Sequence, residues 1–98
     1  MLLHTVNHAP LSSQCLSDCL RVITAPAALL LIEDGVYGAS PKHESLFVEL
    51  TGDIACYALQ ADVEARGLVG LISPRFTLVS DAEFVELTIQ CQRTQSWY

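Results

Sequence analysis

The chain has 98 residues, enough for one domain over residues 1–98 that buries roughly 65% of the surface its unfolded chain would expose. Apolar residues make up 51% of it and charged residues only 16%, so we expect part of the apolar surface to meet another subunit. Eleven acidic and five basic residues give a net charge of −6, and the scattered bases exclude a basic patch that binds nucleic acid directly.

No apolar stretch approaches the roughly 18 residues that span a bilayer, and the N-terminal segment lacks the features of a signal peptide. We therefore expect a cytoplasmic protein without a membrane partner. Four cysteines in so short a chain could form a disulfide scaffold, but such scaffolds are typical of secreted proteins. The sequence predicts free thiols.

The first elements are a buried strand and a helix. Leu2–Val6 is a short apolar run that predicts the strand. The helix is expected to begin at Ser12 or Ser13 and to run to about Thr24, because Pro26 stops it. The residues expected on its apolar side are Cys15, Leu16, Cys19, Leu20, Val22 and Ile23.

The middle of the chain predicts two more strands around a helical segment. Ala28–Glu33 is an apolar run of strand length, typical of a strand covered on both faces in a parallel sheet. A helical segment over Val36–Leu50 follows, broken near Pro41, and the third strand covers Ile54–Leu59. The residues of the helical segment expected to turn inward are Leu46, Phe47 and Leu50.

A short helix over Gln60–Arg66 is expected to end at Gly67, since glycine most easily adopts the left-handed conformation after a last turn. Val69–Ile72 and Phe76–Ser80 are both candidate strands, and only one of them need join the sheet. Strands that alternate with helices at this spacing predict an α/β fold, a three-layer sandwich with a mainly parallel sheet of four or five strands.

Ser80 and Glu83 have the spacing of a capping box and predict the start of a final helix. The residues expected on its inner face are Phe84, Leu87, Thr88 and Cys91. Near the end of the chain, Trp97 is expected to pack at a subunit interface, because large aromatic side chains serve as interface anchors.

Active regions of open α/β sheets lie beyond the carboxyl ends of the strands, which selects His4–His8, Glu33–Tyr37 and the turn after Leu59. Glu33 and Asp34 could act as paired carboxylates, but the favoured interpretation is that Asp34 caps the following turn. The histidines lack the spacing of a metal site, and no glycine-rich phosphate-binding motif follows the first strand. We expect neither a metal nor a cofactor.

Cysteine is the only residue type here with a credible nucleophilic role. Cys56, within a strand, and Cys91, on the apolar face of the last helix, are expected to be buried. Cys15 and Cys19 lie one helical turn apart. A helix N-terminus favours a thiolate, which places Cys15 ahead, because Asp18 disfavours a negative charge on Cys19.

Five segments resemble the TusB/DsrH family of sulfur-relay subunits: Met1–Asn7, Leu29–Tyr37, Ala65–Leu68, Phe84–Thr88 and Gln95–Tyr98. The resemblance implies a DsrEFH-like fold and a heterohexamer with two copies each of three homologous chains. The partners would be TusC/DsrF-like and TusD/DsrE-like subunits, of which the TusD/DsrE-like one carries the main sulfur-accepting cysteine. Persulfide sulfur would then pass to a TusE/DsrC-like carrier.

In DsrH-type members a cysteine of the first helix lies in a stretch similar to residues 17–21. The resemblance therefore implies Cys19 as the persulfide carrier, with Cys15 as its rival and a buried, inert thiol as the alternative. TusB relatives serve 2-thiolation of the tRNA wobble uridine, and DsrH relatives serve the oxidation of stored sulfur.

We expect a TusB-like accessory subunit of a sulfurtransferase complex. The alternatives are a DsrH-like subunit that uses Cys19 and a stand-alone cysteine-dependent enzyme. An enzyme of that kind needs a base at a fixed distance from its nucleophile.

Overall fold

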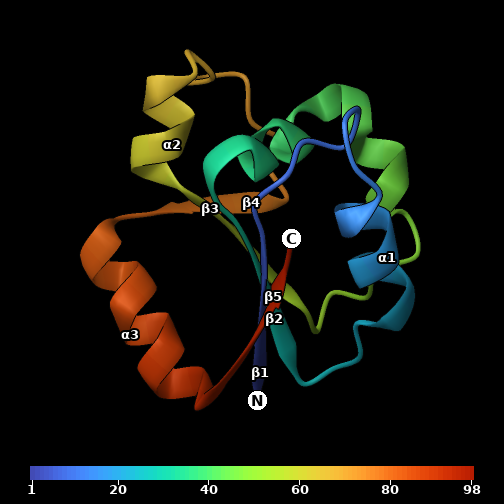
Figure 1. Ribbon diagram of the computed structural model, residues 1–98, viewed down its shortest axis with the longest axis vertical. Helices are drawn as coiled ribbons and strands as arrows, with labels where there is room; N and C mark the ends of the chain where they lie inside the picture. Colours follow the sequence, from blue (N-terminus) through green and yellow to red (C-terminus); the bar gives the residue numbers. More distant parts are fainter.

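Five parallel strands form the centre of the molecule, in the order β4-β3-β2-β1-β5 (Figure 1). The structure, a computed structural model, describes residues 1–98. The strands are β1 (Leu2–Val6), β2 (Ala27–Leu31), β3 (Ala55–Leu59), β4 (Phe76–Val79) and β5 (Arg93–Trp97). The all-parallel sheet confirms the α/β class expected from the sequence.

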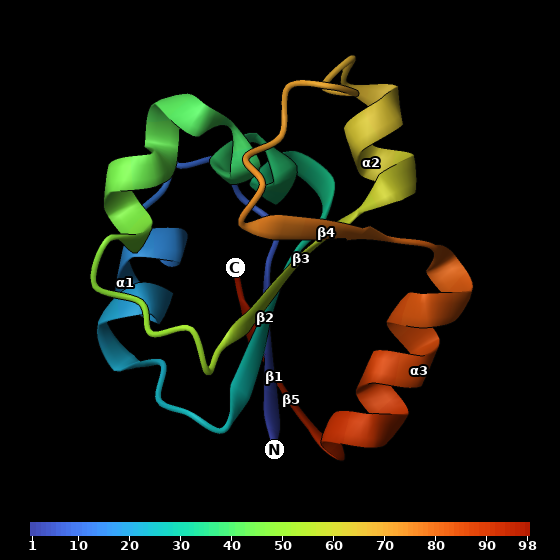
Figure 2. The ribbon, with the colours of Figure 1, turned by 180° about the vertical axis from the view of Figure 1, so that it is seen from behind.

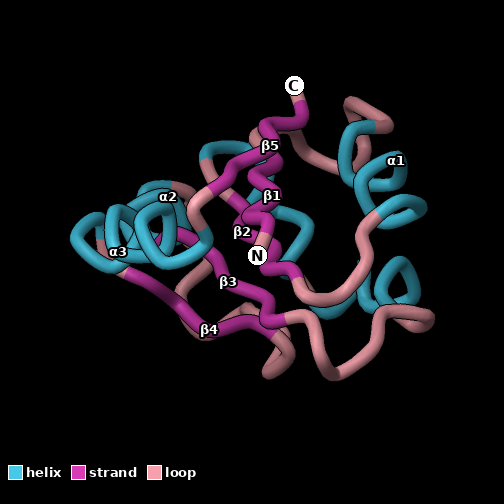
Figure 3. The backbone as a smooth tube through the Cα atoms, turned by 90° about the horizontal axis from the view of Figure 1, so that it is seen from below, coloured by secondary structure: helices cyan, strands magenta, loops and turns pink.

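Helices cover both faces of this sheet. They are α1 (Cys15–Val22), α2 (Gln60–Ala65), α3 (Asp81–Cys91) and the 3-10 helices η1 (Glu33–Ala39) and η2 (Pro41–Phe47). The view from behind and the view from below place α3 on one side of the sheet and α1 on the other (Figures 2 and 3). The molecule is therefore a three-layer sandwich, and α2 continues directly from β3 and contacts η1.

Alternate residues of the central strands feed two apolar clusters. Leu29 and Leu31 belong to the larger cluster, which also holds Leu16 of α1 and residues of η1 and η2. Leu30 belongs to the smaller cluster, together with Cys91 of α3. Every residue of β2 is buried, which explains why its sequence is a continuous apolar run and not an alternating one.

The last helix begins with the capping box that the sequence predicts. The Glu83 backbone N–H donates to Ser80 Oγ at 3.1 Å, and the Ser80 N–H donates to Glu83 Oε1 at 2.8 Å. The turn after α2 is also confirmed, because Gly67 adopts a φ of +67° in the left-handed region.

Several boundaries differ from expectation. Helix α1 begins at Cys15 and not at Ser12 or Ser13, because the Ser12 N–H closes a turn onto the Ala9 carbonyl at 3.1 Å. The expected break near Pro41 is present, but the segments on either side of it are 3-10 helices and not α-helices. Leu46 is more than one-third exposed, whereas the expected inward orientation of Phe47 is confirmed. The segment over 69–72 forms no strand, so β4 alone joins the sheet there.

The fifth strand was not assigned to residues 93–97 by the sequence pattern. It lies at the edge of the sheet beside β1, where most of its side chains are exposed on both faces, so no apolar alternation marks it. Thr5 Oγ1 donates to Ser96 Oγ at 3.3 Å across this pair. The Trp97 indole N–H donates to Nδ1 of buried His4 at 3.1 Å, with the two rings stacked at 6.2 Å.

A close approach near the carboxyl end of β1 requires glycine at position 35. An ideal Cβ there would lie 2.1 Å from the Val6 carbonyl oxygen, whereas one at Gly52 would meet nothing within 4 Å. We predict that Gly35→Ala lowers the free energy of unfolding by about 1–3 kcal/mol, since overpacking displaces backbone. Urea denaturation would measure it, with Gly52→Ala as the control. Equal stability of the two variants would contradict this geometry.

The His4–Trp97 hydrogen bond makes stability depend on pH. Nδ1 accepts a hydrogen bond from the Trp97 indole N–H, which requires a neutral imidazole ring, and burial lowers the pKa of His4 below 6.5. As the pH falls below 6.5, His4 takes up a proton in the unfolded chain but stays neutral in the folded chain until a lower pH. The His4 contribution is thus complete above pH 6.5 and is lost below it, by up to about 1.4 kcal/mol per pH unit.

We therefore predict that His4→Gln flattens the pH dependence of the unfolding free energy between pH 5 and 6.5 more than His43→Gln does. Both rings have a lowered pKa, His43 through burial and the nearby Lys42 charge, but only His4 is nearly inaccessible to solvent. Denaturation series at several pH values would measure both slopes. An unchanged slope in His4→Gln would refute the assignment.

Candidate functional site

All four cysteines are free thiols, and three of them are buried. Cys56 and Cys91 are shielded by the core, as the sequence predicts. Cys19 is also fully buried, because it lies on the side of α1 that packs against the sheet. Burial raises the pKa of the Cys19 thiol to about 12. Burial and the nearby Glu44 charge raise the pKa of Cys56 to about 11, against an opposing effect of Arg75.

Cys15 is the one cysteine with part of its side chain at the surface. It is the first residue of α1, and its backbone N–H donates to Ser13 Oγ at 3.1 Å. The unpaired N–H groups of a helix N-terminus favour negative charge nearby, so this position suits a thiolate. The two α1 cysteines therefore lie one turn apart beside the same apolar cluster, Cys19 fully buried and Cys15 partly exposed.

No base is paired with any of these thiols. The only hydrogen bond from a cysteine side chain runs from Cys56 Sγ to the Ile54 carbonyl at 3.8 Å. The Nδ1 atom of the buried His4 ring is bonded to Trp97. The nucleophile–base pair that a stand-alone cysteine enzyme requires is therefore not formed in this structure.

The carboxyl ends of β1, β2 and β3 meet as the sequence rule expects, and polar side chains gather there. Arg66, the residue that follows α2, is the centre of the group: its Nε donates to Asp34 Oδ1 at 2.9 Å, and its Nη1 lies 3.6 Å from Asp62 Oδ1. The Glu33 N–H donates to Asp62 Oδ2 at 2.6 Å. These contacts join η1 to α2 and hold the end of the sheet in one arrangement.

Two details of this cluster correct or extend the sequence analysis. Asp34 does not cap the turn, since η1 has no side-chain cap and the carboxylate pairs with Arg66. Asp62 was not singled out, although its four-residue spacing from Arg66 on a short helix is a usable signal for an ion pair. The Arg66 guanidinium is shared by Asp34 and Asp62, so these contacts link η1 to the end of α2.

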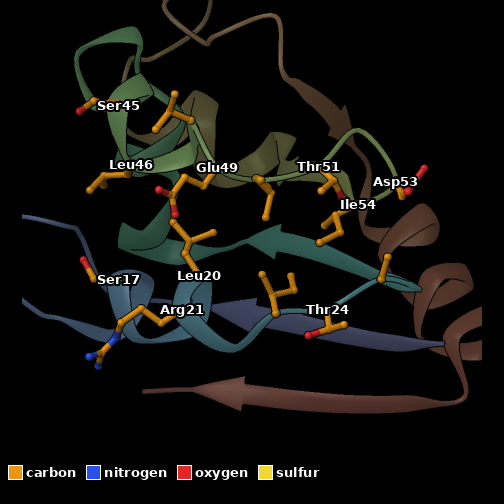
Figure 4. Close-up of a pocket in the computed structure, with 14 residues that line it drawn as sticks. Ser17, Leu20, Arg21, Thr24, Ser45, Leu46, Glu49, Thr51, Asp53 and Ile54 are labelled. Carbon is orange, nitrogen blue, oxygen red and sulfur yellow. The ribbon is translucent and has the colours of Figure 1, made fainter.

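A pocket of about 780 Å³ opens between α1, η2 and the loop before β3 (Figure 4). Leu20 of α1 lies across from Leu46 and Glu49, which come from the η2 region. No cysteine lines this pocket. The sequence did not identify it, because its walls come from three separate segments. The lining residues are Ser17, Leu20, Arg21, Ile23, Thr24, Ala25, Ser45, Leu46, Val48, Glu49, Leu50, Thr51, Asp53 and Ile54.

Comparison with known proteins places this α/β sandwich in a family. Residues 8–94 match the family described as DsrH like protein, so the chain belongs to the DsrH-like family. Protein TusB of Yersinia pestis (strain Pestoides F) is 41% identical over 96 residues, which cover 98% of this chain and all of that protein. Protein TusB of Yersinia pseudotuberculosis (serotype O:1b, strain IP 31758) gives the same figures.

The fold also has a solved counterpart. The solution NMR structure of protein Tm0979 from Thermotoga maritima superposes with a TM-score of 0.67 at 26% sequence identity. The match covers 92% of this chain and 93% of that one. The likeness therefore extends over nearly all of both chains.

The different burial of the thiols predicts their reactivity. At pH 8, a thiol with a pKa of about 12 has on the order of a thousandfold less thiolate than a free cysteine. We expect Ellman's reagent to modify one thiol per folded chain quickly and all four after unfolding in urea. Cys15→Ser should remove the fast reaction and Cys19→Ser should leave it. If the fast reaction were instead missing in Cys19→Ser and present in Cys15→Ser, Cys19 would be the reactive thiol, and α1 would have to move away from the sheet readily.

Proposed function

We propose that this chain works as a companion subunit that assembles with TusC-like and TusD-like chains. The main sulfur-accepting cysteine of the complex would belong to the TusD-like chain. The chain is a TusB-like subunit of the sulfur relay for tRNA 2-thiolation. The observation that carries this function is the 41% identity to TusB proteins over nearly the whole chain. The name of these relatives favours the tRNA branch of the family over sulfur oxidation.

The charges of the chain support a role without direct tRNA contact. Three of its five bases are paired with acids on the same chain: Arg21 with Asp18, Arg66 with Asp34 and Arg75 with Glu44. Phosphate binding needs clustered, available bases, and the net charge is −6. We propose that sulfur leaves the complex on a TusE-like carrier protein. None of the helices has the length and apolar character needed to span a membrane. The identity to TusB proteins supports a cytoplasmic location for the proposed complex.

Exposed apolar side chains support assembly with other subunits. Several large ones lie mostly in solvent on the isolated chain, an arrangement that subunit contacts would relieve. They are Leu11, Val22, Val48, Val69, Leu71, Val85 and Ile89. Trp97 is half-buried against His4, so the remaining face of its ring is available to a partner, which keeps the interface prediction for this residue open to test.

Sulfur transfer to this subunit would be a thiol exchange. A cysteine thiolate attacks the outer sulfur of a partner's persulfide, a new S–S bond forms on the attacking cysteine, and the partner leaves as a thiolate. The step needs an accessible, ionised thiol. Cys15 is the one cysteine that is partly accessible here, whereas Cys19, the residue that the family resemblance suggests, is buried and would become accessible only if α1 moved away from the sheet.

We predict that this chain, co-expressed with TusC-like and TusD-like chains, sediments as one stable complex. Cys15→Ser should assemble like the unmutated chain, because its side chain is partly exposed and makes no side-chain hydrogen bond. Cys19→Ser places an unpaired hydroxyl in the core and should lower stability by about 1–3 kcal/mol, so its complex is compared with that of Cys19→Ala. A chain that stays well folded and unbound in this mixture would refute the companion-subunit role.

Mass spectrometry of the same complex, after it is loaded with a persulfide donor, would test which cysteine of this subunit carries sulfur. A gain of one sulfur on this subunit should disappear in Cys15→Ser and persist in Cys19→Ser. Disappearance in Cys19→Ser alone would instead support the family-derived residue. No gain on the unmutated chain, with the TusD-like partner loaded, would make the subunit purely structural.

A further inference from the structure

A second pocket, of about 690 Å³, lies among the loops at the carboxyl end of the sheet. No cysteine lines it, and two of its side chains, Leu11 and Leu71, are among the exposed apolar ones that support assembly with other proteins. Its walls come from the turn after β1, the junction of η1 and η2, and the loop after α2. The lining residues are Ala9, Pro10, Leu11, Tyr37, Ser40, Pro41, Lys42, His43, Leu68, Gly70, Leu71 and Ile72.

The charge of this pocket is opposite to that of the chain. Lys42 and His43 are its basic side chains, and no aspartate or glutamate lines it, although the chain has eleven acids. Lys42 forms no ion pair, whereas the three arginines described above are neutralised by acids. The pocket of Figure 4 differs, because Glu49 and Asp53 line it. An anionic group is therefore favoured in the second pocket.

The rest of the lining is apolar and unusually accessible. The side chains of Leu11 and Leu71 are 83% and 56% exposed, and that of Tyr37 is 38% exposed. Apolar side chains gathered at one exposed hollow typically mark a binding surface. A ligand that fills it would carry apolar groups beside its negative charge.

Backbone hydrogen bonds hold the walls in place. The Ser12 N–H donates to the Ala9 carbonyl at 3.1 Å, and the Leu71 N–H donates to the Leu68 carbonyl at 2.9 Å. At the η1–η2 junction the His43 N–H donates to the Ser40 carbonyl at 3.0 Å. Because these turns are already formed, binding would cost little ordering of the protein.

We propose that this pocket binds a short segment of a partner protein that carries leucine-like side chains next to an aspartate or glutamate. The apolar side chains would cover Leu11 and Leu71, and the carboxylate would pair with Lys42. Charge complementarity selects this occupant over a basic segment. The inference is independent of whether any cysteine of the chain carries sulfur, and the purified chain alone can test it.

The probe is an acetylated, amidated tetrapeptide with the order leucine, leucine, aspartate, leucine, titrated into the labelled chain and followed by proton–nitrogen NMR. The amide signals of Lys42, Gly70 and Leu71 should shift. A peptide with asparagine in place of aspartate, and the variant Lys42→Glu, should each bind about tenfold more weakly or worse, since one charge-assisted contact is lost.

Two controls isolate the pocket from the overall charge. Lys42→Arg retains the cation and should bind within about twofold of the unmutated chain. Arg93 lies on exposed β5 and does not line the pocket. Arg93→Glu changes the net charge by the same amount as Lys42→Glu and should therefore retain binding. The proposal is overturned by unshifted pocket signals, by equal binding of both peptides, or by an equal loss in Arg93→Glu. Lys42-dependent self-association in sedimentation would identify a second copy, not a partner, as the occupant.

Discussion

Parallel strands have to be covered on both faces, and this requirement shapes the whole chain. β2 sits in the middle of the sheet with all five residues buried, so apolar layers are needed on both sides. One face is covered by α3, and the other by α1 with the 3-10 helices. With 98 residues, few are left for anything else. Three of the four cysteines are used in these layers as small apolar side chains.

The same constraint explains why the chain presents surfaces in place of a catalytic cluster. At the carboxyl end of the sheet, where α/β proteins commonly bind substrates, Gly35 approaches the Val6 carbonyl and Arg66 pairs with Asp34 and Asp62, so the pocket that remains there lies among the surrounding loops. The exposed features are pockets between loops and single apolar side chains. Such features fit a subunit that contacts other proteins and leaves the main thiol chemistry to a partner.

Residues with strong local signals were predicted well from the sequence. β1 matches at both ends, the Ser80 capping box is formed, and Gly67 ends α2, because in each case neighbouring residues determine the conformation. Features set by distant contacts were not predicted. β5 depends on pairing with β1, and Asp34 depends on Arg66, which lies 32 residues away. The sequence places both Cys15 and Cys19 on the apolar side of the helix and leaves a buried thiol as one alternative, because helical spacing does not tell which part of a wide apolar side faces the sheet.

The 2-thiouridine content of tRNA tests the central claim most directly. Nucleosides from tRNA would be measured by mass spectrometry in cells with the gene for this chain deleted and again after the gene is returned. A TusB-like subunit predicts that the wobble 2-thiouridine falls sharply on deletion and recovers with the gene. Unchanged 2-thiouridine after deletion, in cells that still make the TusC-like and TusD-like chains, would contradict the account.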